Sequence, residues 1–131
     1  MRRPTKDPIA RRAILAIAGC RIAIGVGVLA APRAALRALG FSEPNTQTLA
    51  LARVAGSRDL ALGALTVAAR DDSRRLRGVG IAAIGVDAAD AVTFALASRQ
   101  PGFGLVGAGN ALAGTAAALV GSWAWRRLGR S

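Results

Sequence analysis

The chain has 131 residues, a formal net charge of +11 and a hydrophobic content of 53%. That length allows one domain. Because His is absent and Cys occurs once, the composition excludes His- or Cys-based metal sites, His-dependent catalytic triads and a disulfide framework. Soluble domains have about 45–50% apolar residues. A higher apolar content together with a high charge is typical of a membrane protein with charged loops.

Four apolar segments follow one another along the chain, at residues 13–31, 49–69, 78–98 and 103–125. Each is close to the roughly 20 residues that cross a bilayer as a helix. Their runs of Ala, Leu and Gly lack the alternation that a membrane β-barrel requires. The link 32–48 is long enough for a short amphipathic helix at the interface. We predict an all-α fold, a four-helix transmembrane bundle that forms a single integral membrane domain over residues 1–131.

The basic residues alternate between the connections. Twelve lie before the first segment, between the second and third, and after the fourth, whereas the other two links hold three. The positive-inside rule then predicts that both termini are cytoplasmic. Trp123 and Trp125, just before Arg126, suit an interfacial anchor at the cytoplasmic end. We therefore expect a multi-pass protein of the bacterial inner membrane whose main partner is the lipid bilayer.

Six charged side chains fall inside the predicted spans, three basic and three acidic. An unpaired charge at the bilayer centre costs about 2.5–3.5 kcal/mol on insertion scales. We therefore predict an intramembrane network that pairs Arg21, Arg53 and Arg58 with Asp59, Asp87 and Asp90, with Asn110 as a further polar partner. On a helix, Arg58 points about 140° away from Arg53. One of these two is thus expected to face a second protomer or to extend to an interface.

Three weaker patterns favour plainer interpretations. The run Ile17 to Cys20 resembles a lipobox, but the apolar stretch before it is short and the span continues beyond it. The glycines at 104, 107 and 109 miss the G-x-G-x-x-G pattern, so we expect close helix packing along Gly107, Ala111, Gly114 and Ala118. The Arg pairs at 74–75 and 126–127 suit contact with anionic lipid, and no nucleic-acid partner is predicted.

The stretch from Arg53 to Gly63 fits the pattern R-x-x-G-x-R-[DE]-L-x-L-G. With Arg21 in the first span, Pro32-Arg33 after it and a D-x-x-D at Asp87 in the third, it resembles a group of small four-helix bacterial integral membrane proteins of unknown function. The resemblance covers nearly the whole chain. It implies a four-span membrane fold and no particular activity.

Three functions remain open from the sequence. The first is an accessory or structural membrane component, alone or in a larger complex, whose charge network sets helix packing. The second is a small proton-coupled transporter or carrier that acts as a homo-oligomer. The third is a soluble basic helical protein, which the alternation of basic loops disfavours. We predict no enzyme, no catalytic residue, no metal and no cofactor, because no nucleophile–base pair or metal-ligand constellation is visible.

Overall fold

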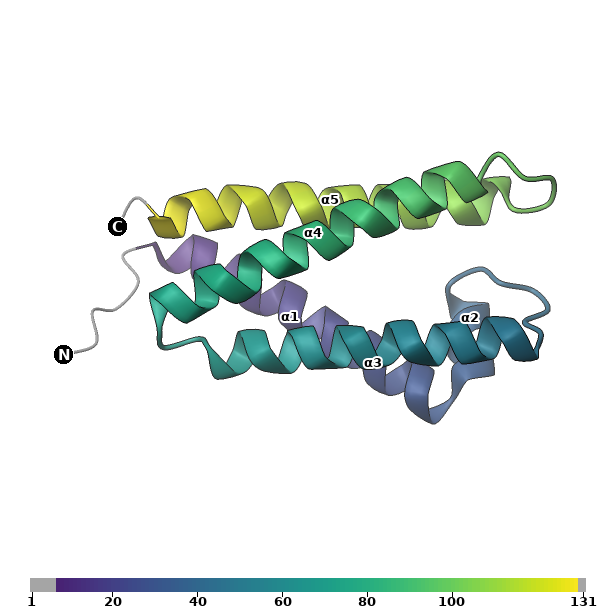
Figure 1. The fold of residues 1–131 in the computed structure, drawn as a ribbon, viewed down its shortest axis with the longest axis horizontal. Coiled ribbons are helices and arrows are strands. Elements are labelled where there is room, and N and C mark those ends of the chain that lie inside the picture. The colour runs from purple at the N-terminus through teal and green to yellow at the C-terminus, as the bar shows by residue number, and fades with distance from the viewer. Residues whose placement is uncertain (1–6, 130–131) are drawn as a thin grey trace.

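The computed structural model describes residues 7–129, and this part of the chain is all-helical. Its five helices are α1 (Pro8–Ala30), α2 (Pro32–Ala38), α3 (Thr46–Ala68), α4 (Ser73–Ala97) and α5 (Gly104–Gly129). The four longer ones have 23 to 26 residues and lie side by side (Figure 1). The short helix α2 lies in the link where the sequence left room for an interfacial helix.

Polar caps explain why α1, α3 and α4 begin three to five residues before the apolar segments at 13, 49 and 78. The side chains of Asp7, Asn45 and Asp72 accept hydrogen bonds from backbone N–H groups of the first turn. At Asp72, which is exposed, the backbone N–H groups of Arg75 and Arg74 lower the pKa of the carboxyl below its ordinary value, and the N–H of Arg75 has the larger effect. Hydropathy does not register a capping side chain, so it places each start too late.

Glycines bring α1 and α3 into close contact. A Cβ atom on Gly25 would lie 2.6 Å from the carbonyl oxygen of Gly56, and one on Gly63 would lie 2.8 Å from that of Ala18. Gly56 and Gly63 are seven residues apart, and small residues at such spacing let helix backbones approach closely in a membrane. The α1–α3 contact is therefore a tight, glycine-dependent pair.

A second close pair joins α4 to α5. A Cβ atom on Gly107 would lie 2.7 Å from the Cα of Ser98, and one on Gly114 would lie 3.0 Å from the carbonyl oxygen of Asp87. These contacts place Gly107 and Gly114 on the packing face that the sequence predicted for them. The molecule thus consists of two tight pairs, α1–α3 and α4–α5.

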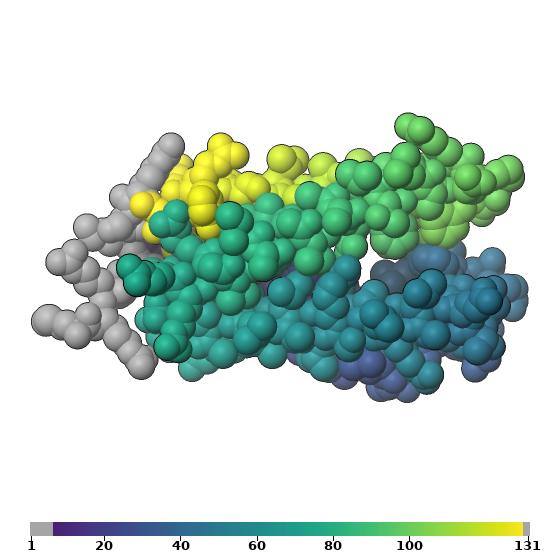
Figure 2. Space-filling model, in the orientation of Figure 1, coloured from purple at the N-terminus to yellow at the C-terminus, as the bar shows by residue number. Residues whose placement is uncertain are grey.

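The two pairs meet at one end and diverge toward the other. At the end that holds the α3–α4 link, Ala10 and Ile14 of α1 pack against Leu76 of α4 and Leu128 of α5, and Leu76 is fully buried. Toward the end that holds α2, the space-filling view shows the surface hollowed between α3 and the α4–α5 pair (Figure 2). We call the first the basic end and the second the α2 end.

Within residues 7–129, the basic regions predicted to share one side of the membrane lie at one end of the molecule (Figure 1). Arg11 hydrogen-bonds the carbonyl oxygen of Arg70 and pairs with Asp71 across the α3–α4 link. The indole Nε1 of Trp125 donates to the carbonyl oxygen of Arg77 at 3.1 Å, and the Arg77 guanidinium lies 4.6 Å from the centre of that ring. Trp125, one of the two tryptophans predicted as an interfacial anchor, therefore fastens α5 to the start of α4.

Three helices, α1, α4 and α5, are long and apolar enough to cross a membrane. Large apolar side chains on them face outward, among them Ile24, Ile81, Leu105 and Leu112. Such apolar exposure is typical of lipid contact, and it indicates a multi-pass membrane protein. The second predicted span, 49–69, falls on α3, which is not among these three helices. Every 18-residue window of α3 includes Arg53, Arg58 and Asp59, more charge than such a span carries.

Candidate functional site

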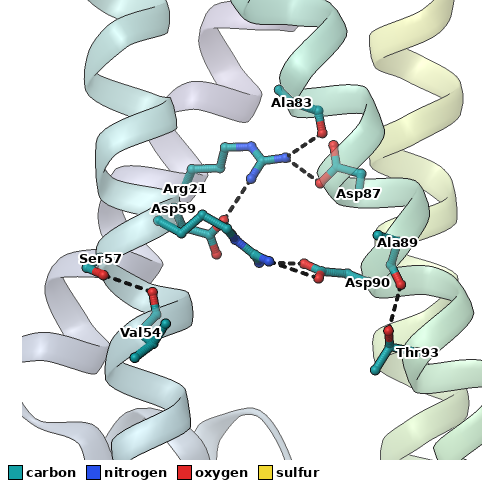
Figure 3. A network of polar contacts seen from close by, with 10 residues as sticks. Arg21, Val54, Ser57, Asp59, Ala83, Asp87, Ala89, Asp90 and Thr93 are labelled. Atoms are coloured by element: carbon teal, nitrogen blue, oxygen red, sulfur yellow. Dashed lines mark hydrogen bonds and ion pairs between the residues drawn. The ribbon is translucent and has the colours of Figure 1, made fainter.

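Arg21 lies at the centre of a polar cluster between three helices. It extends from near the middle of α1, and its side chain is only 8% exposed. Its Nη1 donates to the Asp59 carboxylate of α3 at 2.7 Å, and its Nη2 donates to the Asp87 carboxylate of α4 (Figure 3). The same Nη2 lies 3.4 Å from the carbonyl oxygen of Ala83. One guanidinium thus joins α1 to both α3 and α4.

A second ion pair lies beside the first. Arg58 of α3 meets Asp90 of α4 through two parallel contacts, Nη1–Oδ1 at 3.1 Å and Nη2–Oδ2 at 2.7 Å. This is the bidentate geometry in which guanidinium and carboxylate interact best. Nη2 of Arg58 also lies 3.7 Å from an Asp59 oxygen, so the two ion pairs form one five-residue group. We call Arg21, Arg58, Asp59, Asp87 and Asp90 the charge cluster.

The local sequence explains why these side chains meet. Asp87 and Asp90 are three residues apart, so they occupy one face of α4 and point toward the α1–α3 pair. Asp59 and Arg58 are adjacent on α3, and each reaches a different partner. The backbone approach at Gly63 brings α3 close enough to α1 for Arg21 to reach across. The glycine packing and the ion pairs therefore depend on one another.

Two residues of the predicted network lie outside it. Arg53 is exposed on α3, and within residues 7–129 its side chain makes no ion pair or hydrogen bond. It is about five residues, or roughly 7.5 Å of helix rise, closer to the α2 end than Arg58. Asn110 donates instead to the carbonyl oxygens of Val106 and Leu39. It ties α5 to the end of α2, because it lies too near the start of α5 to reach the cluster.

Beside the cluster lies a small cavity of about 30 Å³. It extends from Arg21 and Asp87 toward the basic end, and Thr66 of α3 also lines it. A buried water needs about 10–15 Å³ and two to four polar partners. The Nε of Arg21 is buried without a hydrogen-bond partner among the described residues, and the Asp87 carboxylate and the Thr66 hydroxyl can accept. The cavity therefore has the size and polarity to hold water.

Apolar groups lie on either side of this polar interior, one at the basic end and one at the α2 end. The buried group around Leu76 and Leu128 closes the basic end. At the α2 end the ring of Phe103 lies 5.5 Å from that of Phe41 and 6.4 Å from that of Phe94. These are the three phenylalanines of the chain. They join the link after α2 to α4 and to the residue that precedes α5.

Sequence reasoning placed all five members of the charge cluster in one predicted network, but it missed Thr66 and the phenylalanine group. Thr66 is the buried polar residue of α3 that faces the cavity, and its hydroxyl donates to the carbonyl oxygen of Leu62 at 2.7 Å. A hydroxyl inside an apolar segment could have indicated Thr66 as a further polar residue of the site. The phenylalanines are separated by 53 and 9 residues, and their meeting depends on how the helix pairs diverge.

The cluster also holds an unequal number of charges. The sequence offered three Arg and three Asp, but with Arg53 outside, two guanidiniums face three carboxylates. When all five are ionised, the cluster carries one net negative charge.

In comparisons with known proteins, no family model, no curated protein and no solved structure matches this chain.

Proposed function

We propose that the chain is a four-span membrane protein in which α3 crosses the bilayer together with α1, α4 and α5, and that both termini are cytoplasmic. The pairing of its charges supports a transmembrane α3. Arg58 and Asp59 are held within the charge cluster, and Leu51, Val54 and Leu65 of the same helix are more than half exposed. A helix with paired charges inside and apolar side chains outside suits a lipid environment.

Within this topology, we propose that the protein is an accessory or structural membrane component whose charge cluster fixes the arrangement of the two helix pairs. The supporting observation is the position of Arg21. It reaches from the α1–α3 pair to Asp87 of the α4–α5 pair, near the middle of the helices, beside the pair of Arg58 with Asp90. Polar contacts between membrane helices specify one arrangement because the alternative leaves a charge in lipid.

Reporter fusions test the topology. Four spans place Ser131 on the cytoplasmic side and Glu43 on the periplasmic side. We therefore expect activity at Ser131 from a reporter that works only in the cytoplasm, and activity near Glu43 from a reporter that works only in the periplasm. If α3 does not cross, the chain has three spans and its ends lie on opposite sides. A periplasmic reporter at Ser131 together with a cytoplasmic N-terminus would then overturn the four-span proposal.

The second candidate is a proton-coupled carrier of the bacterial inner membrane, acting as a homo-oligomer. Two observations favour it: the cavity beside Arg21, and the side chains of Arg58 and Asp90, each of which is about one third exposed. Both give the cluster access to small polar species. In liposomes, a carrier predicts pH-dependent flux that Asp90→Asn abolishes although the variant still inserts. If liposomes with the wild-type protein show no more flux than empty liposomes, the carrier is contradicted and the structural role remains.

A further inference from the structure

The uneven charge of the cluster is the feature that the structural role does not explain. A group that only fixes helix packing is best served by balanced pairs, yet three carboxylates share two guanidiniums. Asp59 shares its guanidinium partner, because Arg21 also binds Asp87. The other contact of Asp59, with Arg58, is long at 3.7 Å. The charged groups that face the site are all members of the cluster, one on α1, two on α3 and two on α4. The stretch of α5 that faces it, from Gly114 to Gly121, has no charged residue.

Arg53 does not supply the missing charge. It lies on the exposed part of α3, at the flank of the α1–α3 contact and away from the face that carries Asp59. Its position toward the α2 end suits a side chain that extends to the membrane interface. The excess negative charge is therefore not neutralised by any basic side chain of residues 7–129.

An excess carboxylate in a low-dielectric site has a simple way to become neutral. Carboxylates that share one site do not all ionise together, and the group takes up a proton instead. The cavity supplies a place for the exchanging water, because Arg21 and Asp87 both line it. The unpartnered, buried Nε of Arg21 is a donor that such a water would satisfy.

We propose that the charge cluster is a proton-binding site, which holds one proton shared among Asp59, Asp87 and Asp90 and exchanges it through water in the adjacent cavity. On binding, a hydronium ion in the cavity gives up the proton, so one of its O–H bonds breaks, an O–H bond forms to one carboxylate oxygen, and a neutral water remains. The proton belongs to the group rather than to one residue, because the three carboxylates are coupled through the same guanidiniums. The inference rests on the proposed membrane location of α3, which keeps the cluster in a low dielectric.

Infrared spectroscopy of the protein in lipid bilayers tests this directly. A protonated carboxylic acid has a carbonyl stretching band that an ionised carboxylate lacks, and ¹³C-labelled aspartate identifies the band as Asp. At neutral pH we expect a band of about one equivalent in the wild-type protein. Asp90→Asn equalises the charges, so its band is expected to vanish, whereas Arg58→Gln is expected to raise it to about two equivalents.

Two matched variants serve as controls. Arg53→Gln removes a basic residue of the same helix outside the cluster, and Asp71→Asn removes a carboxylate at the basic end. Both are expected to keep the wild-type band. Asp90 is the carboxylate chosen for substitution because its side chain is 34% exposed, so the variant is the one most able to fold. The band of the wild-type protein is measured without any substitution, so that test does not depend on whether a variant folds.

Three outcomes would overturn the proposal. The first is the absence of the band from the wild-type protein at neutral pH. The second is a band that Asp59→Asn, Asp87→Asn and Asp90→Asn all leave intact. The third is a band that appears only in sodium-free buffer, since a metal cation would then neutralise the cluster. The reporter at Ser131 is independent of these measurements, so a failed topology and a failed proton site can be distinguished.

Discussion

Arg21 and Arg58 belong to one cluster, yet the protein surrounds them differently. The Arg21 side chain is 8% exposed and contacts two helices besides its own, whereas that of Arg58 is 37% exposed and forms its bidentate pair with a single helix. The first lies where the helix pairs still converge, and the second lies where they begin to diverge toward the α2 end. The cluster therefore has a buried side, which holds the pairs together, and an accessible side.

The largest effect is expected from Arg21→Gln. It leaves Asp59 and Asp87 buried without their cation, and losing one partner of a buried ion pair costs about 3–5 kcal/mol. Arg58→Gln is expected to cost less, because its partner Asp90 is 34% exposed and therefore less desolvated than Asp87. Unfolding by SDS titration in mixed micelles measures both variants against the wild-type protein.

A rescue separates charge from shape in this comparison. Arg21→Gln combined with Asp59→Asn and Asp87→Asn removes the uncompensated charges and is expected to recover much of the lost stability. Equal losses for Arg21→Gln and Arg58→Gln would contradict the distinction between a buried and an accessible side.

A smaller effect is expected from the glycine contact that brings Arg21 to α3. Gly25→Ala places a Cβ atom 2.6 Å from the backbone oxygen of Gly56, so α1 and α3 must separate, and overpacking of this kind costs about 1–3 kcal/mol. Gly27→Ala is the matched control two residues away, where nothing lies within 4 Å of the new Cβ atom. It is expected to stabilise α1 slightly, because Ala favours the helix over Gly.

The same SDS titration measures both glycine variants. A Gly25→Ala protein as stable as Gly27→Ala would show that the α1–α3 contact does not depend on the missing side chain. A loss confined to Gly25→Ala would link helix packing to the charge cluster, since Arg21 reaches Asp59 only while the two helices stay close.

The helical class and the charge cluster were predictable from the sequence because both follow from local rules. Four apolar segments of helical length mark the long helices, and the cost of burying charge identifies Arg21, Arg58 and the three aspartates. The exclusion of Arg53 was not predictable from depth alone. It follows from the rotation of α3 about its axis, which the Gly56 and Gly63 contacts with α1 fix.

The division into two helix pairs was also hidden in the sequence. Glycines recur in every long helix, and the composition does not tell which of them meet a neighbour. Gly25 and Gly107 have close partners, whereas Gly27 and Gly109 have none within 4 Å. The phenylalanine group at the α2 end depends on this arrangement, and so does the cavity beside Thr66. Both are consequences of tertiary packing between segments far apart in the chain.

The smallest effect is expected at the basic end, far from the cluster, where Asp72 caps α4. Its carboxylate accepts from the backbone N–H groups of Arg74 and Arg75 at 3.0 and 3.1 Å, and these bonds lower its pKa. A carboxyl whose pKa is lower in the folded state contributes stability above its ordinary pKa, and this contribution is lost as the pH falls through the lowered value. We expect the amide resonances of Arg74 and Arg75 to shift with pH in that acidic range.

Asp72→Asn keeps a good capping side chain and removes the titrating group. The amide shifts of Arg74 and Arg75 are therefore expected to lose their dependence on acidic pH while α4 still begins at Ser73. Because Asp72 is exposed, the variant is expected to leave the SDS titration close to that of the wild-type protein, in contrast to Arg21→Gln. A cap at the surface and an ion pair between helices use the same carboxylate chemistry, and only the burial of the second makes it decisive for the fold.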